Sequence, residues 1–248
     1  MGKLYKKISI IGAGTWGVAI ASHLSTQCQV ELLHYNEDTL QKIHFKKKHP
    51  NIRNFILPES INFSYSNIIN SDLCIIAVPV QNMMSVIEKF NIKTNIPILL
   101  LSKGIESNTL NFPLDILLDC GFNKDTLAIL SGPSHAEQVV INHPTSVVVS
   151  STSQNLSLNL QKLFSNNYFR VYLNSDIIGV QIGGAVKNVI SIASGIVEGL
   201  GYKENTTAAL LSRGLHEIKK LGCGADVVSI GELMKALKAG INTNKIVF

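Results

Sequence analysis

A glycine-rich turn directly after a short apolar segment is the feature that most constrains the fold of this chain. Residues 7–11, Lys-Ile-Ser-Ile-Ile, are rich in β-branched side chains and are predicted to form a strand. Gly12, Gly14 and Gly17 follow with the spacing G-x-G-x-x-G, and a helical pattern begins at once. The first glycine permits a tight turn, the second lets a pyrophosphate approach the backbone, and the third lets helix and strand pack closely. A purely structural turn is the alternative, but the strand–turn–helix context favours a dinucleotide-binding domain.

Short apolar segments recur after this turn and alternate with helical patterns. These predicted strands cover residues 29–33, 73–78, 96–101, 127–130, 145–149 and 169–173. Continuous apolar runs of this length are typical of strands that are buried on both faces of a parallel sheet. We therefore predict an α/β fold, with a doubly wound, mostly parallel, Rossmann-type sheet over residues 1–174.

Beyond residue 174 the strand pattern disappears and helical patterns take over. Residues 176–201 are predicted to form one long helix with several glycines, and residues 206–221 a second helix. Residues 230–239 fit a third, short helix that ends at Gly240. The sequence therefore predicts an all-helical C-terminal domain over residues 175–248.

Composition limits the class of protein. The 248 residues are 46% hydrophobic and carry a formal charge of +5, which is typical of a globular enzyme. The Lys46–Lys48 run fits a solvated loop or helix end better than a nucleic-acid surface, and an anionic substrate would also tolerate the positive bias. The sequence shows neither a signal peptide nor an apolar run that approaches transmembrane length, so we expect a cytoplasmic protein without a membrane span.

The four cysteines, at positions 28, 74, 120 and 223, stand alone in the sequence. Because no C-x-x-C pair is present, we expect free thiols in a reducing compartment and no metal site.

The residues after the second predicted strand should decide between NAD and NADP. An acidic residue there favours NAD through the ribose hydroxyls, whereas a basic residue favours NADP. The stretch His34-Tyr35-Asn36-Glu37-Asp38 leaves this choice open. Glu37 fits either a ribose ligand or an acid in the first turn of a helix, and Tyr35 is an expected cofactor contact.

Polar residues follow two of the later strands, at the edge of the sheet where ligands bind in open α/β folds. Lys103 stands between an apolar strand and Gly104, as either a functional or a solvated lysine. Gly132 and Ser134 could bind an anion through backbone amides and the serine hydroxyl. A plain turn followed by a helix N-cap is the alternative. His135 fits a structural residue at a helix start better than a catalytic base.

The glycine-spaced apolar run of residues 178–190 has a Lys-Asn pair at its centre. Burial of an unpartnered ammonium is costly, so Lys187 is expected to be either paired or catalytic. A lysine that extends along a helix surface is the alternative. Gly183 and Gly184 would permit a close approach of a cofactor or another backbone, and Asn188 is placed to hold a substrate oxygen.

Together these segments resemble the bacterial NAD(P)-dependent glycerol-3-phosphate dehydrogenase family. The matching segments occur in family order: Gly12-Ala13-Gly14-Thr15-Trp16-Gly17, Ser102-Lys103-Gly104-Ile105-Glu106, Ser131-Gly132-Pro133-Ser134-His135-Ala136-Glu137, Phe169-Arg170-Val171-Tyr172, Asp176-Ile177-Ile178-Gly179-Val180-Gln181, Lys187-Asn188-Val189-Ile190 and Ala208-Ala209-Leu210-Leu211-Ser212-Arg213-Gly214. Related reductases of hydroxy acids and of ketopantoate space their lysine three residues before an asparagine. Here Asn188 follows Lys187 directly and position 191 is Ser, which disfavours those families.

The resemblance implies hydride exchange between NAD(P)H and dihydroxyacetone phosphate, which forms sn-glycerol 3-phosphate for phospholipid synthesis. It implies that Lys187 is the general acid/base at the C2 oxygen. It also implies substrate contacts at Lys103, Gly132, Ser134, Lys187 and Asn188. The implied cofactor contacts are Gly12, Gly14, Thr15, Trp16, Gly17, Tyr35, Lys103 and Ala136.

The resemblance also implies later segments that residues 221–248 do not match, namely Gly-Leu-Gly-Asp-Leu, Thr-Cys, Ser-Arg-Asn and Val-Glu-Gly. We therefore expect a shortened helical domain, with poor or no reduction of dihydroxyacetone phosphate. A catalytically impaired or inactive dinucleotide-binding remnant of the enzyme is the alternative. The same shortening would leave apolar faces of the 176–201 helix uncovered, from which we expect aggregation or a homodimer.

Overall fold

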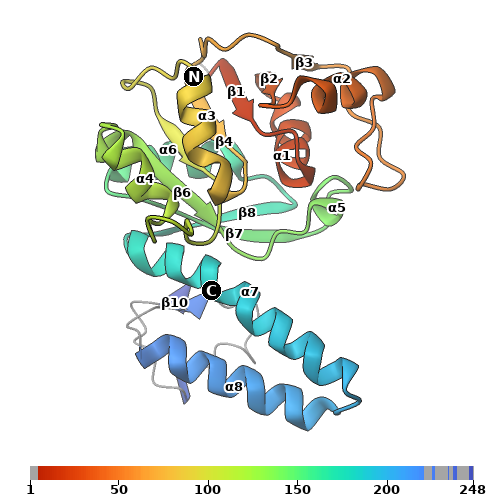
Figure 1. Cartoon of the computed structure of the whole chain (residues 1–248), viewed down its shortest axis with the longest axis vertical. Helices are drawn as coiled ribbons and strands as arrows, with labels where there is room; N and C mark the ends of the chain where they lie inside the picture. Colours follow the sequence, from red (N-terminus) through yellow and green to blue (C-terminus); the bar gives the residue numbers. More distant parts are fainter. Residues whose placement is uncertain (1–4, 221–224, 227–233, 235–236, 239–245, 248) are drawn as a thin grey trace.

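The computed structural model describes residues 5–220, 225–226, 234, 237–238 and 246–247. It consists of an α/β sheet domain and a pair of long helices that projects from one edge of it (Figure 1). The strands are β1 (Lys7–Ile11), β2 (Gln29–Leu33), β3 (Ile61–Phe63), β4 (Leu73–Ile76), β5 (Ile98–Leu100), β6 (Leu127–Ser131), β7 (Thr145–Ser151), β8 (Phe169–Asn174), β9 (Ala225–Asp226) and β10 (Ile246–Val247). The α-helices are α1 (Thr15–Ser25), α2 (Glu37–Lys46), α3 (Met83–Lys89), α4 (Pro113–Asp119), α5 (Ala136–Val139), α6 (Gln154–Phe164), α7 (Ile177–Gly199) and α8 (Glu204–Lys220).

The eight-stranded sheet has the order β3-β2-β1-β4-β5-β6-β7-β8. Strands β1 to β6 are parallel to their neighbours, β7 is antiparallel to β6, and β8 pairs parallel to β7. The predicted α/β class with a doubly wound, mostly parallel sheet is confirmed. In such a sheet the strand order reverses between β1 and β4, and ligands bind at that point of the carboxyl edge.

Two apolar cores cover the two faces of the sheet. One contains side chains from α1, α2 and α6, and the other contains side chains from α3, α4 and the start of α7. Ile10 and Ile75 belong to the first core, whereas Ile11 and Ile76 belong to the second. Because successive side chains of a strand alternate between faces, strands inside such a double layer are apolar at every position.

The observed strands differ from the predicted ones mainly at their ends. The predicted strand 73–78 ends at Ile76, because the chain turns at Ala77 toward the glycine-rich loop. Strand β3 was not predicted: it has three residues, of which Asn62 is exposed, so it lacks an apolar run. The predicted short helix over residues 230–239 lies outside the described residues, apart from Met234, Leu237 and Lys238.

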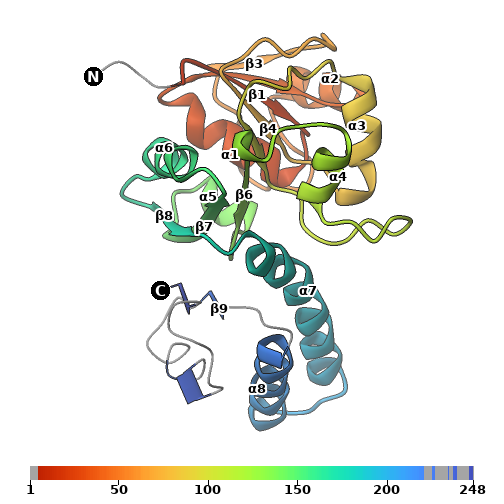
Figure 2. The same ribbon diagram turned by 90° about the vertical axis from the view of Figure 1, so that its left-hand side faces the viewer.

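The helices α7 and α8 form an antiparallel pair below the sheet domain (Figure 2). They approach closely at Gly214, where a side chain would meet Ile190: an added Cβ would lie 2.8 Å from the Ile190 Cδ1 atom. Asp176 caps the N-terminus of α7, where its carboxylate accepts a hydrogen bond from the Gly179 amide at 2.9 Å. The two long helices predicted after residue 174 are therefore present, each within a few residues of the expected bounds.

The expectation that no apolar run reaches transmembrane length was wrong for α7. This helix has 23 residues and a mean hydropathy of 1.4 over its most apolar window, only 11% of which is buried. By length and composition alone it could cross a membrane. Its first turns nevertheless pack on the sheet domain, where Gln181 accepts a hydrogen bond from the Leu114 amide at 3.0 Å.

The rest of α7 presents an apolar surface to solvent in the described part of the chain. The side chains involved are between 57% and 70% exposed and recur at helical spacing: Val189, Ile192, Ile196 and, directly after the helix, Leu200. The uncovered apolar face that was expected is therefore present, whereas a dimer formed through it stays a prediction.

Acidification is expected to destabilise the sheet domain between pH 7.5 and pH 5.5. Burial lowers the pKa of His23, His34 and His49 below the ordinary value of about 6.5. The unfolded chain therefore takes up protons at higher pH than the folded protein, and stability falls as pH decreases through this range. Urea unfolding midpoints at the two pH values test this prediction. His23→Gln should weaken the dependence, and the exposed control His143→Gln should keep it. Equal wild-type midpoints would contradict it.

Candidate active site

The glycine-rich turn connects β1 to α1 at the carboxyl edge of the sheet. Gly12 has φ +121°, and its amide donates to the Leu33 carbonyl at 2.8 Å. A side chain on Gly12 would collide with the Ala77 carbonyl, and one on Gly17 would collide with the Gly12 carbonyl. Both positions therefore require glycine to preserve the backbone packing.

Gly14 differs from the other two glycines because no protein atom lies within 4 Å of where its Cβ would be. It is exposed and stands at the N-cap of α1, without a side-chain hydrogen bond to the first turn. Side chains cap α2, α6 and α7 but not α3 or α5, so the open space around Gly14, rather than the missing cap alone, distinguishes the start of α1. An open backbone at an uncapped helix N-terminus fits a diphosphate, which accepts hydrogen bonds from amides and is favoured by the helix dipole.

The other residues predicted near this turn follow either the turn itself or strand β2, whose last residue, Leu33, accepts a hydrogen bond from Gly12. Thr15 and Trp16 form the first turn of α1, and the Trp16 indole Nε1 is buried without a hydrogen-bond partner among the described residues. Tyr35 follows β2 and is 40% exposed, with its ring edge-on to His34. His49, which sequence reasoning did not select, is 7% exposed, and its Nδ1 atom accepts a hydrogen bond from the Asn51 amide at 3.1 Å.

Lys103 links the ends of β5 and β6. Its Nζ atom donates to the Gly132 carbonyl at 3.0 Å and lies 3.5 Å from the Ser134 Oγ atom. Gly132 has φ +133° and its carbonyl also accepts from the Ser134 hydroxyl at 3.2 Å. Lys103, Gly132 and Ser134, which are three of the predicted substrate-binding residues, therefore lie together, although Lys103 and Gly132 are 29 residues apart in the sequence.

The loop after Lys103 is folded around one carboxylate. Glu106 accepts hydrogen bonds from the amides of Thr109 and Asn108, at 2.7 and 3.0 Å. These hydrogen bonds lower the pKa of the Glu106 carboxyl, with the bond from Thr109 first in importance. Ser102, on the other side of Lys103, donates to the Val78 carbonyl at 2.6 Å. Lys103 thus extends from a loop that is fixed on both sides.

Helix α7 packs directly on this cluster through Gly184. A Cβ on Gly184 would lie 2.9 Å from the Ser131 hydroxyl oxygen and 3.6 Å from the Lys103 Cγ atom. The cavity between α7 and the ends of β5 and β6 is only about 10 Å³, which is about the space of one water molecule. A side chain at Gly184 would have to displace the Ser131 hydroxyl, and the space left at this contact is too small for a molecule larger than water.

Lys187 and Asn188 follow Gly184 by three and four residues, so they lie one helical turn farther along the same side of α7. Both side chains are exposed, and no hydrogen bond or ion pair joins them to another residue in the described part of the chain. Lys187 is therefore not paired within the described part of the chain, and its exposure agrees with both a catalytic lysine and a lysine that extends along the helix surface. The apolar neighbours lie along the helix rather than around the ammonium.

The structure places the remaining predicted residues at the start of α5. Ala136 is the first residue of this helix and is buried, whereas His135 is the exposed N-cap residue. His135 thus precedes a helix, as the structural interpretation expects, and no side chain among the described residues forms a hydrogen bond or ion pair with it. Among the described residues, no cluster of three or more histidine, cysteine or acidic side chains could hold a metal ion.

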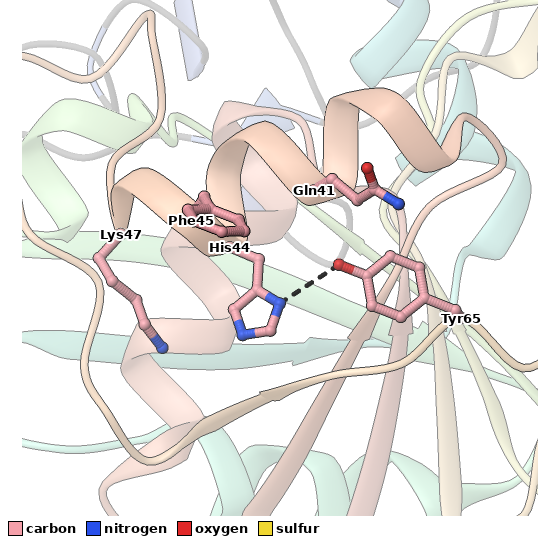
Figure 3. A pocket seen from close by; sticks show the side chains of 5 residues that line it. All are labelled: Gln41, His44, Phe45, Lys47 and Tyr65. Carbon is pink, nitrogen blue, oxygen red and sulfur yellow. Dashed lines mark hydrogen bonds between the residues drawn. The ribbon is translucent and has the colours of Figure 1, made fainter.

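A larger surface groove lies elsewhere, along the outer side of α2 (Figure 3). It has a volume of about 530 Å³ and is lined by Gln41, His44, Phe45, Lys47 and Tyr65. The His44 ring Nδ1 atom lies 3.2 Å from the Tyr65 hydroxyl, while Phe45 is 94% exposed. None of these side chains belongs to the cluster at the ends of β5, β6 and β1.

The strand order, the glycine turn and the uncapped helix define a doubly wound dinucleotide-binding fold with a helical C-terminal part. Sequence comparison identifies the particular family. The profile for the N-terminus of NAD-dependent glycerol-3-phosphate dehydrogenase matches residues 7–157, and the profile for its C-terminus matches residues 176–236. The chain belongs to the NAD-dependent glycerol-3-phosphate dehydrogenase family.

Similar proteins of known sequence carry the same name. Glycerol-3-phosphate dehydrogenase (NAD(P)+) of Bacillus pumilus is 40% identical over 227 residues, which cover 88% of this chain and 66% of that protein. The Halothermothrix orenii protein of that name is 41% identical, with 87% and 65% covered. This chain thus spans about two thirds of the length of the relatives it matches.

A solved structure supports the same relationship. The crystal structure of glycerol-3-phosphate dehydrogenase from Coxiella burnetii superposes with a TM-score of 0.78 and 29% identity, covering 88% of this chain and 69% of that one.

Proposed function

We propose that this protein is an NAD(P)-dependent glycerol-3-phosphate dehydrogenase, which interconverts dihydroxyacetone phosphate and sn-glycerol 3-phosphate and so feeds glycerophospholipid synthesis. The packing of Gly184 against Lys103 and Ser131 carries this proposal. It joins the helix that bears Lys187 to the sheet edge that bears the glycine-rich turn. In this proposal, residues 1–174 bind the dinucleotide, and residues 175–248 contribute the substrate side of the site.

The residues divide the chemistry between them. NAD(P)H, when bound, supplies the hydride for the substrate carbonyl carbon. Gly12, Gly14, Thr15, Trp16 and Gly17 would hold its diphosphate at the start of α1, with Tyr35 and Ala136 farther along the cofactor.

Reduction of a ketone leaves a developing alkoxide, which needs a proton and positive charge nearby. We assign the proton to the Lys187 ammonium, which is exposed one turn beyond the closed packing at Gly184. The phosphorylated substrate would be bound by the Lys103 ammonium and the Ser134 hydroxyl, at the turn that contains Gly132. Asn188 offers an amide next to Lys187. In this arrangement the hydride comes from the nicotinamide and the proton from Lys187, and together they convert the ketone to an alcohol.

Two further predictions accompany this proposal. We infer a cytoplasmic location, because the substrate is a phosphorylated metabolite, and a homodimer, because the apolar face of α7 is exposed.

The substrate assignment is tested with the purified protein and reduced dinucleotide. Dihydroxyacetone phosphate should cause loss of the nicotinamide absorbance, and unphosphorylated dihydroxyacetone should cause at least about a hundredfold less at equal concentration, because it lacks the charged group that Lys103 and Ser134 are assigned to hold. Nucleotide binding is measured in parallel by fluorescence. Equal rates with both ketones would contradict the assignment of these residues to a phosphorylated substrate.

A further inference from the structure

The cofactor preference that the sequence left open can be argued from the end of β2. The Leu33 carbonyl at this end accepts a hydrogen bond from Gly12, so the residues that follow β2 are next to the dinucleotide turn. In dinucleotide-binding folds this position contacts the adenosine ribose, where an acid favours the free 2′-hydroxyl and a cation favours a 2′-phosphate.

The side chains that directly follow β2 supply no free cation. Asn36 is occupied, since its Oδ1 atom accepts the Thr39 amide at 2.9 Å and caps α2. His34 is half-buried, and burial, followed by the nearby charge of Lys89, lowers its pKa and favours the neutral ring. Glu37 is the first residue of α2, and its side chain is 57% exposed.

A cation reaches this position from a distant segment. Lys89 is the last residue of α3, and its Nζ atom donates to the Tyr35 carbonyl at 2.8 Å. The same ammonium lies 4.0 Å from the Glu37 carboxylate, at the outer limit of an ion pair. The Tyr35 contact fixes the ammonium at the end of β2, while Glu37 is held loosely enough to turn away.

We propose that Lys89 is the residue that selects the cofactor, by binding the 2′-phosphate of NADP(H). This inference rests on the proposed function, because it assumes that a dinucleotide occupies the turn. An ammonium has three N–H donors, so Lys89 keeps the Tyr35 contact and still has two for phosphate oxygens. The phosphate would replace Glu37 as the counter-charge, and NADPH should bind more tightly than NADH.

The test compares NADPH and NADH by fluorescence titration, which needs no turnover. Lys89→Met should weaken NADPH binding about tenfold or more and change NADH binding less than about twofold, as expected for loss of one charge-assisted contact. Lys89→Arg should retain the NADPH preference, because it retains the cation. Glu37→Gln should strengthen NADPH binding, because it removes the competing carboxylate.

Lys42→Met is the matched control, since Lys42 is an exposed lysine on α2 and its removal changes the net charge equally. It should leave both affinities unchanged, and unfolding midpoints should confirm that all variants fold. Equal loss of both nucleotides in Lys89→Met, or an unchanged ratio of affinities, would overturn the role of Lys89. Failure of the wild-type protein to bind either nucleotide would instead refute the proposed function.

Discussion

Replacement of Gly14 by valine is expected to reduce dinucleotide binding by more than about a hundredfold and to leave the fold intact. The open space around Gly14, with no protein atom within 4 Å of a Cβ, is the space assigned to the diphosphate. A Cβ at this position meets no protein atom, and an N-cap substitution of this kind costs only about 1 kcal/mol of stability or less. It would, however, fill the approach to the backbone amides.

Gly17→Ala is the informative comparison for this prediction. Its added carbon would collide with the Gly12 carbonyl, so we expect a lower urea unfolding midpoint together with weaker binding. Gly14→Val should separate the two effects, with an unchanged midpoint and lost nucleotide fluorescence. Normal nucleotide titration in Gly14→Val would show that the diphosphate does not lie on this turn.

The second large effect is expected at Lys187. Lys187→Ala should lower turnover of dihydroxyacetone phosphate by about 10²–10⁴-fold, the usual contribution of general acid–base catalysis. Because Lys187 is exposed and has no partner among the described residues, its loss should change neither the unfolding midpoint nor nucleotide affinity.

Lys162→Ala is the control for that measurement, since Lys162 is an exposed lysine on α6, on the opposite side of the sheet domain. It should retain full turnover. If turnover of Lys187→Ala stays within about twofold of the wild-type protein, the proton comes from another group. A parallel loss of stability and turnover would indicate a structural lysine.

The sheet could be predicted because its strands are short and buried on both faces. Leu73, Cys74, Ile75 and Ile76 form an unbroken apolar run for that reason. β3 could not be predicted, because its three residues do not form an apolar run and are recognised as a strand only by their backbone pairing with β2. Local sequence therefore predicts a strand where burial on both faces requires every residue to be apolar, and it does not predict a strand whose residues are partly exposed.

The candidate site could be predicted only in part. Glycine spacing identifies the turn, since Gly12 and Gly17 are required by local backbone contacts. Lys103 and Gly132 meet only through tertiary folding, and so do Lys89 and Tyr35, which are 54 residues apart. For Lys187 the sequence left two interpretations open, a paired or catalytic lysine and a lysine on the helix surface, because an apolar helix can also present its apolar side chains to solvent, as α7 does at Val189.

Transfer of a labelled hydride tests the proposed reaction most directly. The protein is incubated with dihydroxyacetone phosphate and NADPH that carries deuterium at the transferred position of the nicotinamide ring, and the product is analysed by nuclear magnetic resonance. We predict sn-glycerol 3-phosphate with deuterium on C2, formed in equal amount to the oxidised nucleotide. Full nucleotide binding with no deuterium on C2 would contradict the proposal and would show that the site binds the dinucleotide without catalysing this reduction.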